Sequence, residues 1–383
     1  MMTRSTPLIL AMAMLGCMFG GAMAQAPMLM PAGPPETLYR WTSDRCEDEF
    51  IPDAPARAFR RADGAMVLMA SHRENWALTG RDFATLRPSC EATLRSSRER
   101  PQDDGFLWIE ATFTSDGRRV AALVSEDLRR PTLRGGCDPQ GQAGRCWLNN
   151  ILAAASEDGG RSFALLRSEA RTVATLGRYP ERASRRYGAF TTSNILQHDG
   201  AYYVMVYLQG EGVQPPGNCL FRSDDPFAPE RWRAWDGQGF TVEMRDASTP
   251  RACRPVSPSV LSQEVRSLTF DSRHGRWIAV IRHRLRLPGD AQPVPGFYYA
   301  TSPDLLRWEG PRRIMAAPTR ARTDSRTETM DYPALIDPGS RSRNFDTLDS
   351  TAPVLVFTVQ NLAPGTGTGT MNRDLRFVRL RVE

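Results

Sequence analysis

The sequence predicts an all-β protein, and within that class a five-bladed β-propeller. One theme recurs at intervals of roughly 50 to 80 residues, a spacing that suits propeller blades carrying loop insertions. Each copy has a short β run, a tight turn and a second, more apolar run. Helical periodicity is scarce along the whole chain. A repeated pair of hairpins without helices is typical of radially arranged sheets.

The first hairpin of each copy turns on Asp-Gly, His-Gly or a longer insertion. Asp-Gly between two apolar runs is a strong signal for a two-residue hairpin. The fifth copy instead carries the insertion 337–352. The five hairpins span Ala56–His72, Trp108–Glu126, Ser193–Leu208, Ser267–His283 and Tyr332–Gln360.

A second hairpin follows each of the first four copies, with a turn of Ser, Asp and Gly or Pro that closes on an aromatic or apolar residue. The clearest case is Ser156–Phe163, S-E-D-G-G-R-S-F. Its glycines permit positive φ, and its Ser and Asp side chains can bond the backbone of the turn. Further cases are Phe221–Trp235, Tyr299–Trp308 and, more weakly, Leu78–Leu86. Two hairpins per copy give four strands.

The two ends of the chain are expected to close the ring. The fifth copy supplies three evident strands, the last being Leu375–Val382, and Leu38–Trp41 can add as its outer strand. Closure removes exposed sheet edges. The prediction is therefore one propeller domain over 38–383, preceded by a flexible segment over 25–37, with six blades as the alternative count.

Residues 1–24 read as a secretory signal peptide. Arg4 precedes an apolar run, and Ala22-Met23-Ala24 is an A-x-A cleavage site. The mature protein is expected in the periplasm or outside the cell. The alternative is a lipoprotein anchored through Cys17. Elsewhere no stretch has 18 consecutive apolar residues, so no membrane span is expected.

Six cysteines remain after the signal peptide, an even number that predicts three disulfides in an exported protein. Pairing in chain order is the simplest of the possible connectivities. The spacings fit no zinc site, the four histidines are dispersed, and no nucleotide or phosphate-loop motif is present. No metal or cofactor is expected. The cysteines are Cys46, Cys90, Cys137, Cys146, Cys219 and Cys253.

The charge pattern argues against a nucleic-acid partner. All 49 basic residues are arginines, and they are spread among 43 acidic residues rather than gathered on one segment. Hydrophobic residues at 41% and charged residues at 24% are ordinary for a globular protein with a sizeable core. We expect a monomer.

Two resemblances to known families suggest where function resides. Ser156–Phe163 resembles the Asp-box of sialidases, S-x-D-x-G-x-T-W, with Ser162 for Thr and Phe163 for Trp. In that family the box is a structural turn at the blade periphery. Tyr299–Trp308 and Asp331–Pro338 resemble segments of the five-bladed propellers of glycoside hydrolase families 43 and 32. That resemblance implies a polar funnel at one end of the channel, with carboxylates on the first three blades.

Carried over to this chain, the hydrolase pattern selects Asp53 in I-P-D-A-P-A-R and Glu110 in W-I-E-A-T-F. The third blade departs from the pattern, because Asn194 stands where the general acid is expected. The fourth blade offers Glu264 and the fifth offers Asp331. Blades five, one and two are neighbours in a closed ring, so their carboxylates can converge.

The catalytic hypothesis gives Glu110 and Asp53 the roles of acid and of base or nucleophile, with Asp331 tuning their pKa. The structural alternative makes Asp53 a turn cap and pairs Glu110 with an arginine such as Arg57. A sialidase-like template would instead use Arg57, Arg73 and Tyr332, since arginines there bind a substrate carboxylate and a tyrosine is the nucleophile.

A polar cluster at 71–76 ends a predicted strand and adds possible ligand contacts. The residues proposed to bind substrate are Arg57, His72, Arg73, Asn75, Asn194, Glu264 and Tyr332. Together these features predict an exported propeller that acts on or binds carbohydrate, possessing glycosidase activity if it is an enzyme. The alternatives are a non-catalytic glycan-binding propeller and a protein-interaction platform.

Overall fold

The computed structural model describes residues 26–96, 105–129, 147–167, 169–180, 185–246, 248, 251–318, 327–366 and 368–383. The predicted signal peptide and Cys17 lie outside these ranges. Within them, helix is confined to α1 (Trp41–Asp44) and three single 3₁₀ turns, η1 (Phe83–Thr85), η2 (Glu169–Arg171) and η3 (Pro229–Arg231). The remaining elements are strands, so the all-β prediction is confirmed.

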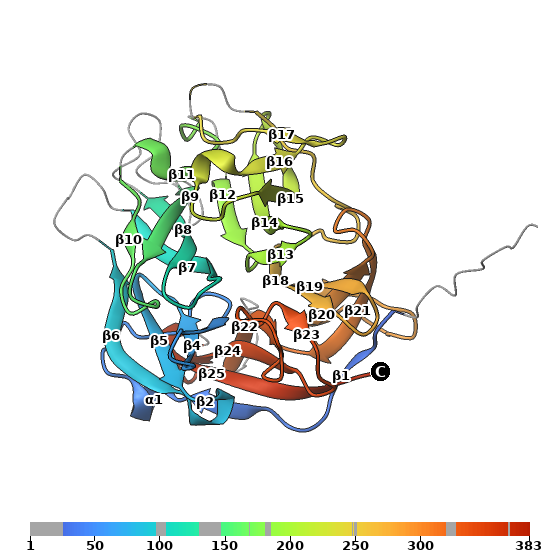
Figure 1. Cartoon of the computed structure of the whole chain (residues 1–383). Helices are drawn as coiled ribbons and strands as arrows, with labels where there is room; N and C mark the ends of the chain where they lie inside the picture. Colours follow the sequence, from blue (N-terminus) through green and yellow to red (C-terminus); the bar gives the residue numbers. More distant parts are fainter. Residues whose placement is uncertain are drawn as a thin grey trace, which may run out of the picture.

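The strands form antiparallel runs arranged around a common centre in a propeller-like ring (Figure 1). The first run is β3 (Arg57–Arg60), β4 (Met66–Ala70), β5 (Glu74–Gly80) and β6 (Arg87–Arg95). The second is β7 (Phe106–Phe113), β8 (Val120–Arg129) and β9 (Trp147–Ser156), with β10 (Ala164–Leu165) and β11 (Thr172–Ala174) both paired to β9.

The third run is β12 (Tyr187–Thr192), β14 (Ala201–Gly210), β15 (Gln214–Ser223), β16 (Arg233–Trp235) and β17 (Phe240–Val242), with β13 (Leu196–His198) also on β14. The innermost strand here is thus split, and it starts earlier than the predicted hairpin at Ser193. A parallel pairing of β12 with β9, Tyr187 opposite Leu148 and Gly188 opposite Asn149, joins the second and third runs into one 11-stranded sheet.

The fourth run is β18 (Val265–Asp271), β19 (Arg276–Leu285), β20 (Val294–Ser302) and β21 (Glu309–Ala316). The fifth is β22 (Glu328–Ile336), β24 (Val354–Leu362) and β25 (Gly369–Val382). The insertion predicted in the fifth copy carries β23 (Thr347–Leu348), which pairs in parallel with β18. It therefore links the fifth run to the fourth.

The core lies between neighbouring runs, because their sheets are covered on both faces. All five residues of β4 are buried, which is why Met66–Ala70 reads as an unbroken apolar run rather than an alternating one. Between the first and second runs, Phe59 and Met69 pack with Val120 and Val124.

Asparagine side chains tie adjacent parts of the ring together. Asn218 donates to the carbonyls of Leu261 and Gln263 and accepts from the amide of Val265, which joins β15 to the start of β18. Asn344, in the insertion of the fifth run, accepts from the amide of Thr114 and donates to its carbonyl. An amide side chain thus replaces strand pairing where the runs diverge.

The turn at 156–163 lies between β9 and β10, as the sequence predicts. The Asp158 carboxylate accepts from the amides of Arg161 and Ser162 at 2.9 and 3.0 Å, and Ser156 Oγ accepts from the Gly160 amide at 2.8 Å. Gly160 has φ of +80°, and a Cβ there would lie 2.5 Å from the Phe59 ring. Glycine is therefore required by both conformation and space. Equivalent turns follow β15 at Ser223 and β20 at Ser302.

Strands from the N-terminal part of the described chain pair with the C-terminal strand (Figure 1). β2 (Glu36–Tyr39) pairs with β25, as expected for a terminal strand that closes the last sheet. β1 (Leu29–Pro31) also pairs with β25, although 25–37 was expected to be flexible. The structure differs because Leu29, only 1% exposed, packs in the apolar cluster of Phe357 and Val382. A single buried side chain in a Pro-rich segment leaves no periodicity to detect.

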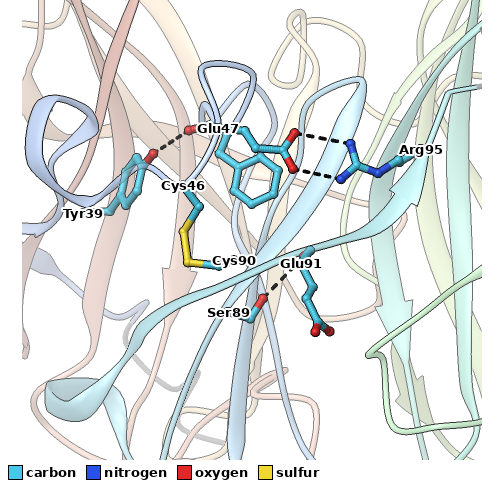
Figure 2. The surroundings of a disulfide bond; sticks show 8 residues. Tyr39, Cys46, Glu47, Ser89, Cys90, Glu91 and Arg95 are labelled. Atoms are coloured by element: carbon cyan, nitrogen blue, oxygen red, sulfur yellow. Dashed lines mark hydrogen bonds and ion pairs between the residues drawn. A yellow bond between two sulfur atoms is a disulfide. The ribbon is translucent and has the colours of Figure 1, made fainter.

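Two of the three predicted disulfides are confirmed. Cys46 bonds Cys90, with the Glu47–Arg95 ion pair beside it (Figure 2), and Cys219 bonds Cys253. Cys137 and Cys146 lie outside the described residues. Among the residues described, no helix is long and apolar enough to cross a membrane.

Replacing Cys46 and Cys90 together by serine is expected to lower the free energy of unfolding by about 4 kcal/mol, because the bond closes a loop across 44 positions and restricts the unfolded chain. Urea denaturation of the oxidised proteins measures the change. Glu47→Gln is the control, since it breaks the adjacent exposed ion pair with Arg95 and leaves the disulfide intact, and it should cost under about 1 kcal/mol. Equal losses in the two variants would contradict the expectation.

Asp158→Ala should destabilise the protein by about 1–2 kcal/mol, because two backbone amides lose a charged acceptor. Glu157→Ala is the matched control, because the exposed Glu157 pairs with Arg119 on the surface and its loss should change stability by under about 0.5 kcal/mol. Both effects are read from thermal and urea unfolding. A loss of ligand binding in folded Asp158→Ala protein would show that this turn is more than a structural element.

Candidate functional site

A polar cavity lies where the innermost strands converge. It has a volume of about 120 Å³, and every strand run contributes to its lining. We call it the central cavity. A second cavity of about 180 Å³, the side cavity, shares Asp53 and Tyr332 with it. The five runs place Asp53 before β3, Glu110 on β7, Thr191 on β12, Arg266 on β18 and Tyr332 on β22.

Glu110 is the carboxyl group in the central cavity with the most unusual surroundings. The residue is 7% exposed, and its Oε2 is buried without a hydrogen-bond partner among the residues that the structure describes. Burial raises the pKa of Glu110 to about 7, against the opposing pull of the Arg266, Arg57 and Arg186 charges. The carboxyl group therefore holds a proton over much of the range below neutrality.

Asp53 has the opposite environment within the same cavity. Its carboxylate forms an ion pair with Arg373 and accepts a 3.1 Å hydrogen bond from the Tyr332 hydroxyl. His72 Nε2 lies 3.9 Å from its other oxygen. Cationic and hydroxyl donors favour the charged form of a carboxylate. Two carboxyl groups with contrasting environments thus face one cavity.

Asp331 and Tyr332 are adjacent residues at a bulge in β22, between Asp331 and Ala334. Tyr332 has φ of +56°, a left-handed conformation that is strained for an aromatic residue. The strain is offset by the bond from its amide to Asp331 Oδ1 and by its hydroxyl bond to Asp53. Asp331 is ion-paired with Arg282 and lines the side cavity, not the central one.

Arg266 lies over the Tyr332 ring, 5.3 Å from its centre, and donates to Thr191 Oγ1 at 3.0 Å. Glu264 lies 3.8 Å from it as an ion-pair partner. Burial would lower the pKa of Arg266, but Glu264, Asp331 and other groups more than compensate and raise it. Glu264 is thus placed as a counterion to Arg266, and it is not among the residues that line either cavity.

Arg57 reaches across the centre of the ring and donates to three backbone carbonyls, those of Ala56, Glu110 and Thr192. It makes no side-chain ion pair with Glu110 within the described chain, in contrast to the structural alternative from the sequence. Burial lowers the pKa of Arg57 to about 10, so it stays charged at neutral pH. Its bonds fix the backbone of β7 at Glu110.

His72 and Arg73 contact Glu49 beside the cavity. His72 Nδ1 lies 3.2 Å from Glu49 Oε2, and Arg73 forms an ion pair with the same carboxylate. Burial, partly opposed by Glu49, lowers the pKa of His72 to about 4, which leaves the imidazole neutral at physiological pH. Arg73 and His72 are outside both cavity linings, and His72 contacts two residues of the central lining, Asp53 and Trp108.

Asn75 and Asn194, expected as ligand contacts, instead join strand runs. Asn75 is fully buried, donates to the carbonyls of Leu94 and Leu107, and accepts from the amide of Ile109. Asn194 exchanges two bonds with the backbone of Leu268. Their amide groups are occupied by main-chain partners, so neither has its polar atoms directed into the central cavity.

Several lining residues were missed by reasoning from the sequence. Asp127 lies two residues from Ser125 on β8, and Trp108 lies two residues before Glu110 on β7, so strand alternation places each pair on one face. Arg266 was missed because the fourth copy was started at Ser267, two residues after β18 begins at Val265. Arg282 on β19 and Arg373 on β25 line the side cavity. No local sequence pattern indicates that side chains of these two strands face that cavity. Trp147 is the first residue of β9 and Arg186 directly precedes β12, and no sequence motif marks either position.

A wider hollow of about 570 Å³ lies over the β14–β15 hairpin. Its charged lining is Arg185 and Glu211, which lie 3.9 Å apart, and no catalytic candidate from the sequence faces it. Among the described residues, no group of three His, Cys, Asp or Glu side chains is placed to hold a metal ion. The central cavity is therefore the stronger candidate site.

Comparison with solved structures supports the fold class. A family 117 glycoside hydrolase from the marine bacterium Zobellia galactanivorans superposes with a TM-score of 0.54 at 11% identity, covering 92% of this chain and 90% of its own. A protein of unknown function from Dyadobacter fermentans gives a TM-score of 0.50 at 14% identity, covering 93% and 99%. No protein-family model and no curated protein sequence matches. The likeness shows a shared all-β fold.

The raised pKa of Glu110 has a measurable effect on stability. Between its ordinary value of 4.5 and about 7, the folded chain binds the proton more tightly than the unfolded chain, so Glu110 lowers stability as pH rises through this window. Glu110→Gln should be more stable than wild type by roughly 3 kcal/mol at pH 8, with the gap closing near pH 4.

Urea unfolding of both proteins from pH 4 to 8 measures the difference in their free energies of unfolding. Titrating groups that both proteins share contribute equally and cancel from this difference. The difference must grow toward high pH. A gap independent of pH would mean that Glu110 titrates normally in the folded protein.

Proposed function

We propose that this protein is an exported, carbohydrate-active enzyme that hydrolyses glycosidic bonds at the central cavity. The observation that carries the proposal is the pair formed by Glu110 and Asp53. Glu110 and Asp53 line the same cavity. Glu110 is buried, and its Oε2 has no hydrogen bond from the described residues, whereas Asp53 is ion-paired with Arg373. Glycoside hydrolysis needs this combination of a protonated and an ionised carboxyl group.

Glu110 is assigned the general acid. With a pKa of about 7 it is protonated below neutrality, so it can donate a proton to the leaving oxygen as the glycosidic bond breaks. Its buried Oε2 has no competing hydrogen-bond partner in the described part of the chain. The arginines around it limit the rise of its pKa, so the proton is not held too tightly to transfer.

Asp53 is assigned the carboxylate that acts as base or nucleophile. Arg373 and the Tyr332 hydroxyl both donate to its carboxylate and fix its orientation. The tuning role expected for Asp331 is reassigned to burial and to the charges of Arg266, Arg57, Arg186 and Asp127, which act on Glu110 directly. Asp331 instead supports Tyr332 through its backbone amide.

The architecture proposed with this activity is a five-bladed propeller, in which each strand run is one blade and the site lies on the ring axis. Two disulfides suit an oxidising compartment, which supports export. The likeness to a family 117 glycoside hydrolase supports carbohydrate as the ligand class. We further propose that the protein acts as a monomer without a nucleic-acid partner.

Glycan binding without catalysis is the second candidate. Trp108 and Trp147 line the central cavity, and aromatic side chains with a few placed polar groups are enough to hold a sugar. The two candidates differ in their dependence on Glu110, because binding alone needs no proton donor.

The test is a screen of aryl glycosides and oligosaccharides on the mature protein and on Glu110→Gln. We expect kcat/KM to fall about tenfold per pH unit above pH 7, as Glu110 loses its proton, and Glu110→Gln to lose about 10²–10⁴-fold in kcat. Glu126→Gln is the control, since Glu126 pairs with Asn150 outside the cavity linings.

Hydrolysis that persists undiminished in Glu110→Gln would overturn the assignment of the acid. Sugar binding by both proteins with no hydrolysis of any substrate would favour the glycan-binding candidate.

A further inference from the structure

Arg186 has the side chain best prepared to bind a ligand in the central cavity. It directly precedes β12, where the parallel pairing with β9 brings it against Asn149 and Trp147. That approach depends on Gly188, whose φ is +116°, since a Cβ there would lie 2.1 Å from the Asn149 carbonyl oxygen. The local backbone is thus shaped to hold Arg186 over the cavity.

The guanidinium of Arg186 is fixed in plane and orientation. Its centre lies 4.4 Å from the Trp147 ring and 4.1 Å from the Phe190 ring. Its Nε donates to Asn149 Oδ1 at 2.7 Å, while the Asn149 amide nitrogen donates to Asp127. Stacked and tethered through Nε, the group is preorganised with its terminal nitrogens unbonded within the described structure.

The other arginines near the two cavities already have partners. Arg373 is paired with Asp53, Arg282 with Asp331, and Arg266 with Glu264 and Thr191. Arg186 differs because no carboxylate in the described chain lies within ion-pair distance of it. Burial lowers the pKa of Arg186, while Asp127 raises it from a greater distance.

We propose that Arg186 binds an anionic substituent of the sugar, so that the site prefers carbohydrates bearing a carboxylate or a sulfate ester. This inference rests on the proposed function and narrows its substrate class. An arginine fork matches both oxyanions, since each offers two oxygens to its parallel N–H donors. The anion supplies the missing counter-charge to a partly desolvated cation.

The geometry also limits where the anion lies. Asp127 is held by Asn149 on the Nε side of Arg186, so an anion must approach the terminal nitrogens and keep clear of that carboxylate. Glu110 presents no full negative charge below about pH 7. Preference for anionic sugars should therefore be strongest in the acidic range, where the proposed proton donor is also protonated.

The test measures binding, independently of turnover, by calorimetry at pH 6 and low salt with glucuronic acid, glucose 6-sulfate and glucose. We expect at least one anionic sugar to bind wild type tenfold or more tightly than glucose. Comparing glucuronic acid with glucose 6-sulfate shows whether the site recognises a carboxylate or a sulfate ester. Arg186→Gln should remove this preference and leave glucose affinity within about twofold.

Arg185→Gln is the matched control. It removes the same charge one position away, from an exposed side chain outside the central cavity, and should keep the preference intact. If Arg186→Gln fails to fold, wild type alone provides the test, since 0.5 M NaCl should reduce the preference severalfold without affecting glucose.

Equal binding of all three sugars by wild type, or equal losses for all three in Arg186→Gln, would overturn the inference about anions while leaving glycoside hydrolysis standing. The absence of any sugar binding, together with no hydrolysis in the glycoside screen, would remove the proposed function and this inference with it.

Discussion

Buried charge at the centre of the ring is the constraint on which the rest of the structure depends. Two of the charged pairs near the centre join different strand runs, although Arg266 pairs with Glu264 within the fourth run. Asp53 before β3 is paired with Arg373 on β25, and Asp331 on β22 with Arg282 on β19. Because an unpaired buried charge is costly, each pair holds two runs in register. The ion pairs that join the runs into a ring therefore also position the residues of the candidate site.

Glu110 is informative because it departs from this arrangement. Arginine charges act on it, yet no donor in the described ranges bonds its buried Oε2, and burial outweighs those charges. A structural carboxylate at this depth would gain stability from a bidentate arginine partner. Arg57 is close enough to provide one but donates to the Glu110 carbonyl oxygen. The chain accepts a stability cost at the residue proposed as the proton donor, and functional sites commonly differ from the core in this way.

The sequence was sufficient for features set by local chemistry. Asp-Gly turns, the Ser156–Phe163 turn and the pairing of Tyr39 with the C-terminal strand follow from hairpin signals and from the need to close an edge. Asp53 and Glu110 were selected from the sequence and both line the central cavity, Asp53 from the segment before β3 and Glu110 from within β7. Asn75 and Asn194 were misjudged, since a polar residue at a strand end has the same sequence signature whether it binds a ligand or the backbone of the next sheet.

What the sequence could not supply was pairing across the ring. Arg373 and Asp53 are separated by 320 positions, and no periodicity relates a β25 side chain to the segment before β3. The same strand also carries β1 and β2 along its length. The N-terminal strands, the final strand and the Asp53 carboxylate thus form one connected unit. Loosening of the terminal strands should release Arg373 from Asp53 before the inner strands separate. The contrast between Asp53 and Glu110 therefore depends on closure at the edge of the ring as much as on residues at its centre.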